Sequence, residues 1–175
     1  SYEARVQVGG VSLRRTGGYA GAFESPATAT VGFEFDTDAL HAVSISRPEN
    51  AGDRGAVAPM GMDGVPVGRA PEVASLPGRH LGSASAGDAV FEVFLVDPAS
   101  VDGRFGSDPY LYVSARTPHN GIVLPMMGLE ATLRRDGVSV WASTLASGLD
   151  SEIGYHYGAS VPGVREGDEV VIETT

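Results

Sequence analysis

The chain has no cysteine and no lysine, and each absence excludes a class of chemistry. Without cysteine there is no disulfide, no thiolate nucleophile and no cysteine-ligated zinc or iron–sulfur centre. All 12 basic residues are arginine, and they face 22 acidic residues, so the net charge is −10. Because nucleic-acid binding depends on clustered basic side chains that neutralise phosphates, we expect no nucleic-acid partner.

The sequence also lacks a long apolar run and a leader. No stretch approaches the ~18 consecutive apolar residues of a membrane-spanning helix, so we predict no membrane span in this part of the protein. The first residues carry no signal core, and both ends read as interrupted strands, which predicts a longer parent protein. An acidic surface without lysine stays soluble where salt screens charges over a few ångströms, so we predict a halophilic source.

Helical periodicity of apolar residues is missing, whereas turn-forming residues are frequent. The 175 residues include 24 glycines and 11 prolines, and 42% of the chain is apolar. This length and composition suit one domain with a substantial core and many turns, or such a domain with an appended segment. Short alternating apolar runs between the turn residues predict an all-β protein.

The region 1–88 reads as strands followed by a strap. Runs at 6–8, 30–35 and 40–45 have strand character, and the turn residues at 36–38 predict a hairpin. Residues 48–88 carry five prolines at positions 48, 59, 66, 71 and 77 and only short apolar pieces, so we predict a long proline-rich loop or strap that packs on a sheet.

The region 89–175 has a more regular strand pattern. Strands are predicted over 89–96, 110–115 and 125–133, with a hairpin through 135–137 into 138–141, a loop around 147–150 and a terminal strand after 168. Short antiparallel strands at this spacing are typical of a two-sheet sandwich. We therefore predict an immunoglobulin-like antiparallel β-sandwich over 89–175.

Motifs for catalysis are missing from the sequence. There is no Gly-x-Ser-x-Gly, no His-Glu-x-x-His and no phosphate-binding Walker loop, and the glycine pairs lie in β context without a following helix. We therefore do not expect an enzyme.

The most distinctive segment is Gly154-Tyr155-His156-Tyr157-Gly158-Ala159. Each ring in it has a polar tip that needs a partner when buried, and imidazole is the commonest metal ligand in proteins. One interpretation is a metal ligand, His156, in an aromatic wall formed by Tyr155 and Tyr157. The other is a packing histidine whose nitrogens are fixed by hydrogen bonds.

Three features of residues 89–175 resemble the periplasmic iron-uptake accessory proteins, a copper-binding β-sandwich family associated with iron transport. These features are the strand entry at 124–129, the hairpin that leads to Trp141, and His156-Tyr157-Gly158-Ala159, which looks like the family's His-Tyr-Gly-Ala-Asn signature. The runs 114–118 and 154–158 also resemble extracytoplasmic haloarchaeal proteins of unknown function that carry a lipoprotein-type export signal.

The resemblance implies a site for copper or iron, but only part of the family's ligand set is present. His156 matches the signature histidine, whereas the family's methionine and carboxylate positions fall on Leu149 and Ile153. Copper favours imidazole and thioether ligands, and a site needs several of them together. The remaining ligand candidates in this sequence are His119, Met126, Asp150 and Glu152.

Two functions follow as expectations. The first is an extracytoplasmic module that handles a transition metal, copper or iron, in connection with iron transport. The second is a structural or protein-interaction sandwich of a cell-surface protein, in which the metal site has degenerated. In the second case the partner is another protein, or a second copy of the chain in a homodimer. His119 then serves as a turn residue, and Met126 and Met127 fill the core.

Overall fold

The computed structural model describes residues 2–8, 13–21, 25–34, 36–37, 45, 47, 49–56 and 68–175. Almost all of its regular structure is β-strand, which confirms the all-β prediction. Helical structure in these described residues is limited to single turns such as Gly17–Tyr19 (η1), Val73–Ser75 (η3) and Pro98–Val101 (η4). No helix in the described ranges is long and apolar enough to cross a membrane. The chain divides into two compact units, residues 1–12 with 21–58 and residues 13–20 with 59–175.

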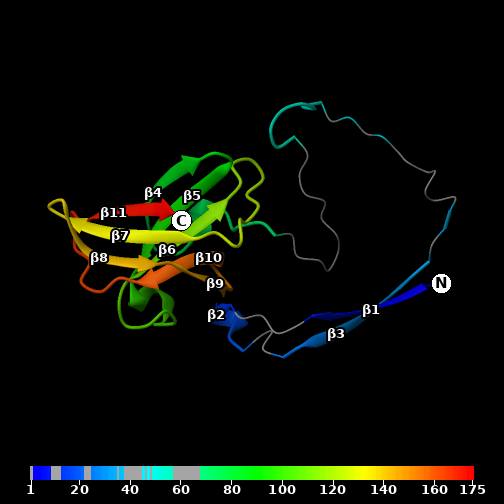
Figure 1. Cartoon of the computed structure of the whole chain (residues 1–175), viewed down its shortest axis with the longest axis horizontal. Helices are drawn as coiled ribbons and strands as arrows, with labels where there is room; N and C mark the ends of the chain where they lie inside the picture. The colour runs from blue at the N-terminus through cyan, green and yellow to red at the C-terminus, as the bar shows by residue number, and fades with distance from the viewer. Residues whose placement is uncertain are drawn as a thin grey trace. The chain divides into compact units, whose positions relative to one another are not determined.

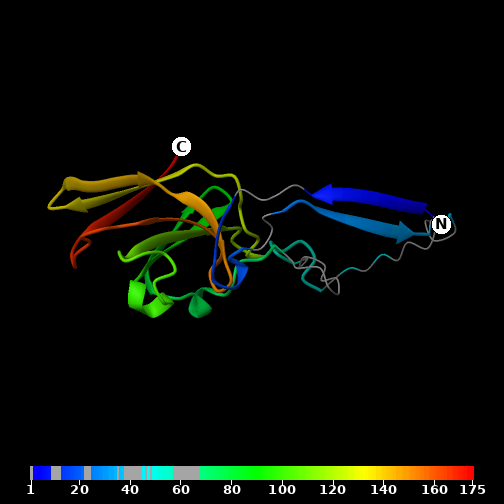
Figure 2. The same cartoon turned by 90° about the horizontal axis from the view of Figure 1, so that it is seen from below.

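The first unit contains an antiparallel pair of strands, Tyr2–Val8 (β1) and Ala27–Phe33 (β3), which Figure 2 shows as a two-stranded ribbon. Tyr2 lies opposite Phe33, and their rings stack with centroids 5.6 Å apart. The strand predicted at 30–35 corresponds to β3, and its observed partner is β1. The other predicted partner, at 40–45, lies outside the described residues except for Ile45.

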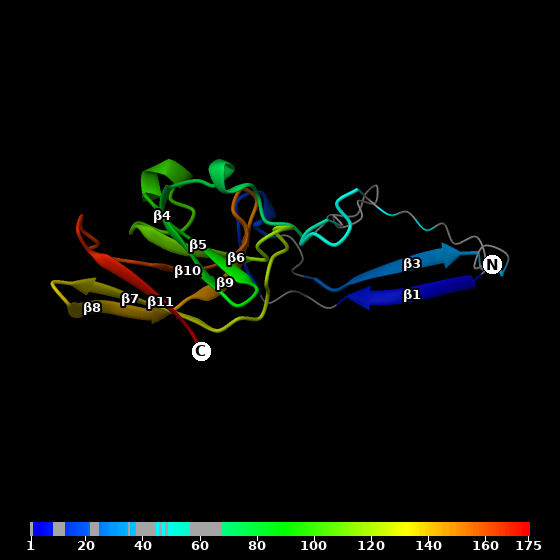
Figure 3. The ribbon, with the colours of Figure 1, turned by 90° about the horizontal axis from the view of Figure 1, so that it is seen from above.

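The second unit contains two sheets. In Figure 3 strands β4, β5 and β6 lie on one side, and β7, β8 and β11 lie on the other. The larger sheet has the order β2-β9-β10-β6-β5-β4, and the smaller has the order β11-β7-β8. The strands of these two sheets are Arg14–Thr16 (β2), Arg79–Ala86 (β4), Ala89–Val96 (β5), Tyr110–Arg116 (β6), Leu129–Arg135 (β7), Val138–Thr144 (β8), Ala146–Asp150 (β9), Gly154–Ser160 (β10) and Glu169–Thr174 (β11).

The main core fills the space between the two sheets. Side chains alternate along each strand, so Phe91 and Val93 of β5 meet Leu129 and Leu133 of β7 in this core. The opposite face of the larger sheet is covered by loops instead, and there Phe94 and Val96 pack in a second cluster. The described residues therefore form an all-β sandwich with both faces of its larger sheet buried in part. The immunoglobulin-like strand arrangement stays a prediction.

The hairpin predicted through residues 135–137 is confirmed. Strands β7 and β8 pair antiparallel, and Asp136 and Gly137 between them have φ of 51° and 79°. A two-residue turn with both φ values positive matches the twist of the flanking strands, which is why an Asp-Gly pair predicts it.

Two predicted loops are strands. Residues 146–150 form β9 where a loop was expected, and residues 79–86 form β4 within the expected strap of 48–88. Both strands are rich in glycine, serine and alanine, so they carry no apolar alternation, and pairing with β10 and β5 organises them instead. The boundary expected at Asp88 falls in the turn between β4 and β5, and residues 57–67 of the strap lie outside the described part.

Candidate functional site

The distinctive segment Gly154–Ala159 lies within β10, between β9 and β6. Because side chains alternate along the strand, Tyr155 and Tyr157 point into the core between the sheets, whereas His156 points to the opposite face. The histidine and the two tyrosines therefore do not line a common wall.

The two tyrosines have structural partners. The hydroxyl of Tyr157 donates to the carbonyl of Leu124 at 2.7 Å and accepts from the backbone N–H of Met127 at 3.0 Å. Tyr155 lies edge-on to Tyr157, with ring centroids 5.4 Å apart. Burial raises the pKa of Tyr157, so its hydroxyl stays protonated and fixes the 124–127 loop to β10.

His156 is a buried, neutral histidine with both nitrogens engaged; its exposed fraction is 1%. Nδ1 lies 3.0 Å from the carbonyl oxygen of Gly154, and because a carbonyl can only accept, Nδ1 carries the proton. Nε2 then accepts from the hydroxyl of Tyr110 at 3.2 Å. Burial raises the pKa of Tyr110 to about 12 and lowers that of His156. Both pKa shifts keep the proton on the Tyr110 hydroxyl, so that Tyr110 donates and Nε2 of His156 accepts.

Glycines make room for this arrangement. A Cβ on Gly148 would lie 3.2 Å from Cε1 and Nε2 of His156, and a Cβ on Gly158 would lie 2.7 Å from Cε1 of Tyr110. The imidazole is further enclosed by edge-on contacts with Phe105, Tyr110 and Tyr112. The glycines around the histidine therefore allow aromatic rings to lie directly on the backbone.

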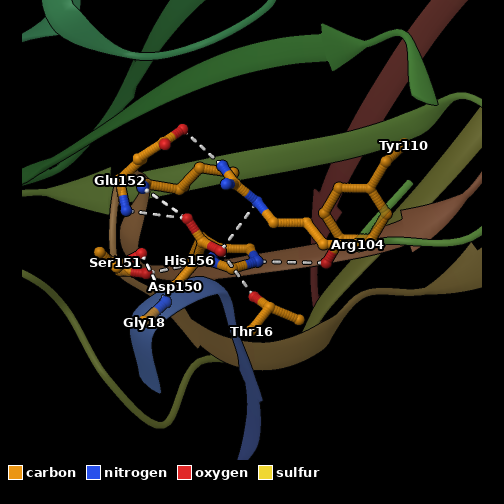
Figure 4. A network of polar contacts seen from close by, with 10 residues as sticks. Thr16, Gly18, Arg104, Tyr110, Asp150, Ser151, Glu152 and His156 are labelled. Atoms are coloured by element: carbon orange, nitrogen blue, oxygen red, sulfur yellow. Dashed lines mark hydrogen bonds and ion pairs between the residues drawn. The ribbon is translucent and has the colours of Figure 1, made fainter. Parts of the chain in front are cut away.

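Asp150, at the end of β9, is the centre of the polar network in Figure 4. Its side chain is 0% exposed. Oδ1 accepts from the backbone N–H groups of Glu152 at 2.9 Å and Ile153 at 3.1 Å. Oδ2 accepts from the hydroxyl of Thr16 at 2.8 Å and lies 3.2 Å from Nε of Arg104.

The charge of Asp150 is maintained by these contacts. Burial alone would raise the pKa of its carboxyl, but the two backbone N–H donors, Thr16 and the Arg104 guanidinium outweigh burial, so the pKa lies below its ordinary value. Arg104 also binds the exposed carboxylate of Glu152 at 2.6 Å. The network thus joins β2, the loop after β5 and the turn between β9 and β10.

The other two predicted ligands lie elsewhere. His119 is exposed in the turn after Thr117, as its alternative interpretation predicted. Met126 is 95% exposed and has φ of 61°, so the prediction that it fills the core is wrong. Met127 does pack against the core. The left-handed backbone at Met126 turns its side chain outward just before β7 begins.

The structure therefore brings together only some of the predicted site residues. Asp150 and Glu152 share Arg104, whereas His156 bonds to Tyr110 beside them, as Figure 4 shows. Within the residues that the structure describes, no three histidine, aspartate or glutamate side chains are grouped so that they could hold a metal ion. Met60 and Met62 lie outside those residues.

A second cluster of polar side chains, on the same face of the larger sheet as His156, was not predicted. Glu92 is 8% exposed; its Oε2 lies 2.8 Å from Nε2 of His80, and its Oε1 accepts from Ser83 at 3.1 Å. Nearby Arg116 is 7% exposed and donates to the carbonyl of Pro71 and to Ser114, each at 2.7 Å. The signal in the sequence is one charged residue within each of two apolar strands, at 92 and 116.

Comparison with known proteins adds one match. The family model described as a domain of unknown function (DUF7350) matches residues 74–175. No curated protein and no solved structure matches the chain. The matched range contains Asp150, His156 and Arg104, whereas Thr16 of the same network lies outside it.

Proposed function

We propose that this chain, which belongs to the family described as a domain of unknown function (DUF7350) through residues 74–175, is a non-catalytic protein-interaction module. Its Asp150 network and His156 serve to hold the sandwich together. In keeping with the resemblance to extracytoplasmic proteins, the interaction takes place outside the cytoplasm.

The observation that carries the proposal is the state of His156. A metal ligand needs a nitrogen lone pair directed at the ion, and the lone pair on Nε2 is directed at the hydroxyl of Tyr110. Nδ1 is bound to the carbonyl of Gly154. To bind copper, the ring would have to break one of these hydrogen bonds and leave its aromatic surroundings.

Asp150 supports the same conclusion. Both of its oxygens accept hydrogen bonds, from β2 and from its own turn, and its charge is balanced by Arg104. Removing these donors from the carboxylate would leave the Thr16 hydroxyl and two backbone N–H groups without their acceptor, which is costly. A carboxylate in this position stabilises the fold better than it captures an ion.

The test is equilibrium dialysis against Cu(I), Cu(II) and Fe(II) in high salt, with metal analysis of the protein. Wild type is compared with His156→Gln and with the matched control His119→Gln, which changes an exposed turn histidine. We expect no stoichiometric metal that depends on His156. One metal ion per chain, lost in folded His156→Gln and kept in His119→Gln, would contradict the proposal in favour of metal handling.

A further inference from the structure

Strand β4 ends the larger sheet. It pairs with β5 on one side, and in the described part of the chain nothing pairs with its other side. Seven of its eight residues are exposed, as the burial pattern along Arg79–Ala86 records. In Figure 1 it lies beyond β5 at the end of the sheet. An edge strand of this length offers a row of backbone donors and acceptors to another strand.

The second half of this edge lacks the features that usually prevent pairing. After the bulge between His80 and Gly82, residues 82–86 are small and uncharged, and they pair regularly with β5. By contrast, β2 is only three residues long, and β11 carries Glu169 and Glu173. Short or charged edges resist pairing, whereas the edge at β4 permits it.

An apolar groove runs beside β4. It has a volume of about 340 Å³ and lies between β4 and β11, lined by Leu81, Ala84, Phe91, Val93, Val170 and Ile172 among others. Leu81 is 36% exposed in the chain on its own. Extending the sheet across this edge would cover both the groove and Leu81, which favours association through removal of apolar surface from water.

The charges at the two ends of β4 identify the partner. Arg79 begins the strand and Asp88 follows its end, and neither has an ion-pair partner in the described residues. When two copies of β4 pair antiparallel about an axis near Ser83 and Ala84, Arg79 of each copy lies opposite the turn at 87–88 of the other, where its long side chain can reach Asp88. A two-fold axis forms this opposite-charge pair twice.

We propose that two copies of this chain associate through their β4 strands, extending the larger sheet across a two-fold axis with two Arg79–Asp88 ion pairs. The inference rests on the proposed interaction function and names its partner. The edge strand β8, which has no charged residue, is a weaker candidate. Asp136 precedes it, but no charged residue follows its end before Asp150, so pairing two copies of β8 would bring no opposite charges together.

The test is sedimentation equilibrium of wild type and of two charge reversals, Arg79→Asp and Asp88→Arg, at one fixed salt concentration. We expect a wild-type dimer at about 100 µM and a dimer dissociation constant at least roughly tenfold higher for each variant. The matched controls are Arg54→Asp and Asp53→Arg, which make the same changes of charge at exposed positions of the other compact unit. They should dimerise like wild type.

The decisive experiment mixes the two charge-reversal variants, Arg79→Asp and Asp88→Arg. One carries Asp at 79 and Asp at 88, and the other carries Arg at both, so the mixture should form a heterodimer about as tightly as wild type forms a homodimer. The double variant Arg79→Asp/Asp88→Arg should likewise recover association. A monomeric wild type at about 100 µM, or a dimer that neither reversal weakens, would overturn the inference. Neither result affects the metal-binding test, so failure here leaves the proposed function with a different partner.

Discussion

Asp150 shows how one side chain can organise a fold. It carries a negative charge at a position with 0% side-chain exposure, accepts hydrogen bonds from β2 and its own turn, and pairs with Arg104. The sequence analysis offered Asp150 as a candidate metal ligand and gave no sign of its structural role, because an aspartate in Leu149-Asp150-Ser151 looks like any turn residue. Its partners lie 46 and 134 residues away, at Arg104 and Thr16, and no local pattern reveals them.

Asp150→Ala should destabilise the protein by about 3 kcal/mol, because it leaves the Thr16 hydroxyl and two backbone N–H groups of its own turn without their acceptor. Glu152→Ala is the matched control. Glu152 binds the same arginine, but its side chain is 58% exposed, so its loss should cost only about 0–1 kcal/mol. Denaturant unfolding monitored through Trp141 measures both. Equal effects of the two substitutions would contradict the role assigned to Asp150.

For His156, the sequence supported two interpretations and could not decide between them. The type and spacing of the residues in 154–158 are the same for a ligand and for a packing histidine. The decision depends on Tyr110, which is 46 residues earlier and reaches Nε2 only because β6 lies beside β10. Glu92 and Arg116 were missed for a similar reason, since each interrupts an apolar strand singly.

At the scale of elements, the strands rich in apolar residues could be predicted from the sequence. The strands made mainly of small residues could not. Residues 89–96 and 110–116 are mostly apolar strands, and the Asp-Gly turn determined the β7–β8 hairpin. Strands β4 and β9 have few apolar residues because β4 is an exposed edge, whereas β9 lies beneath the ring of His156 and the backbone of Arg14. Their small residues are typical of loops in a sequence, and in β9 close packing requires them.

The contact between β10 and β6 gives a test at this scale. Gly158→Ala would place a methyl group against the ring of Tyr110, at 2.7 Å from Cε1, which neither the ring nor the backbone can relieve without moving. We expect a destabilisation of about 1–3 kcal/mol. Gly68→Ala is the control, since its nearest neighbour is 3.9 Å away, and it should stay within about 0.5 kcal/mol of wild type. Thermal unfolding of both variants decides whether the contact is as tight as described.

At the scale of the whole molecule, the sandwich extends beyond the range that the family model matches. Residues 13–20 belong to the same compact unit as 59–175, and β2 among them pairs in parallel with β9. The sequence predicted strands only before and after this short segment, because Arg14–Thr16 has no apolar pattern of its own. It joins the sheet through backbone pairing and the bond from Thr16 to Asp150.

The central claim, that His156 is a buried neutral part of the fold, predicts how stability depends on pH. Burial lowers the pKa of His156 in the folded protein, whereas the unfolded chain takes up a proton near the ordinary value of about 6.5. Below that pH the unfolded state binds more protons than the folded state. The free energy of unfolding therefore falls as the pH drops from about 7 to about 5, by up to about 1.4 kcal/mol per pH unit from this residue.

The most direct measurement is the free energy of unfolding at pH values between about 7 and 5, for wild type and for His156→Gln. The other histidines and the carboxylates are present in both proteins, so the difference between the two curves isolates residue 156. We predict that the wild-type curve falls more steeply toward acid, because the variant has no imidazole to be protonated on unfolding. Parallel curves would show that His156 accepts a proton in the folded protein as readily as in the unfolded chain, and would contradict the account.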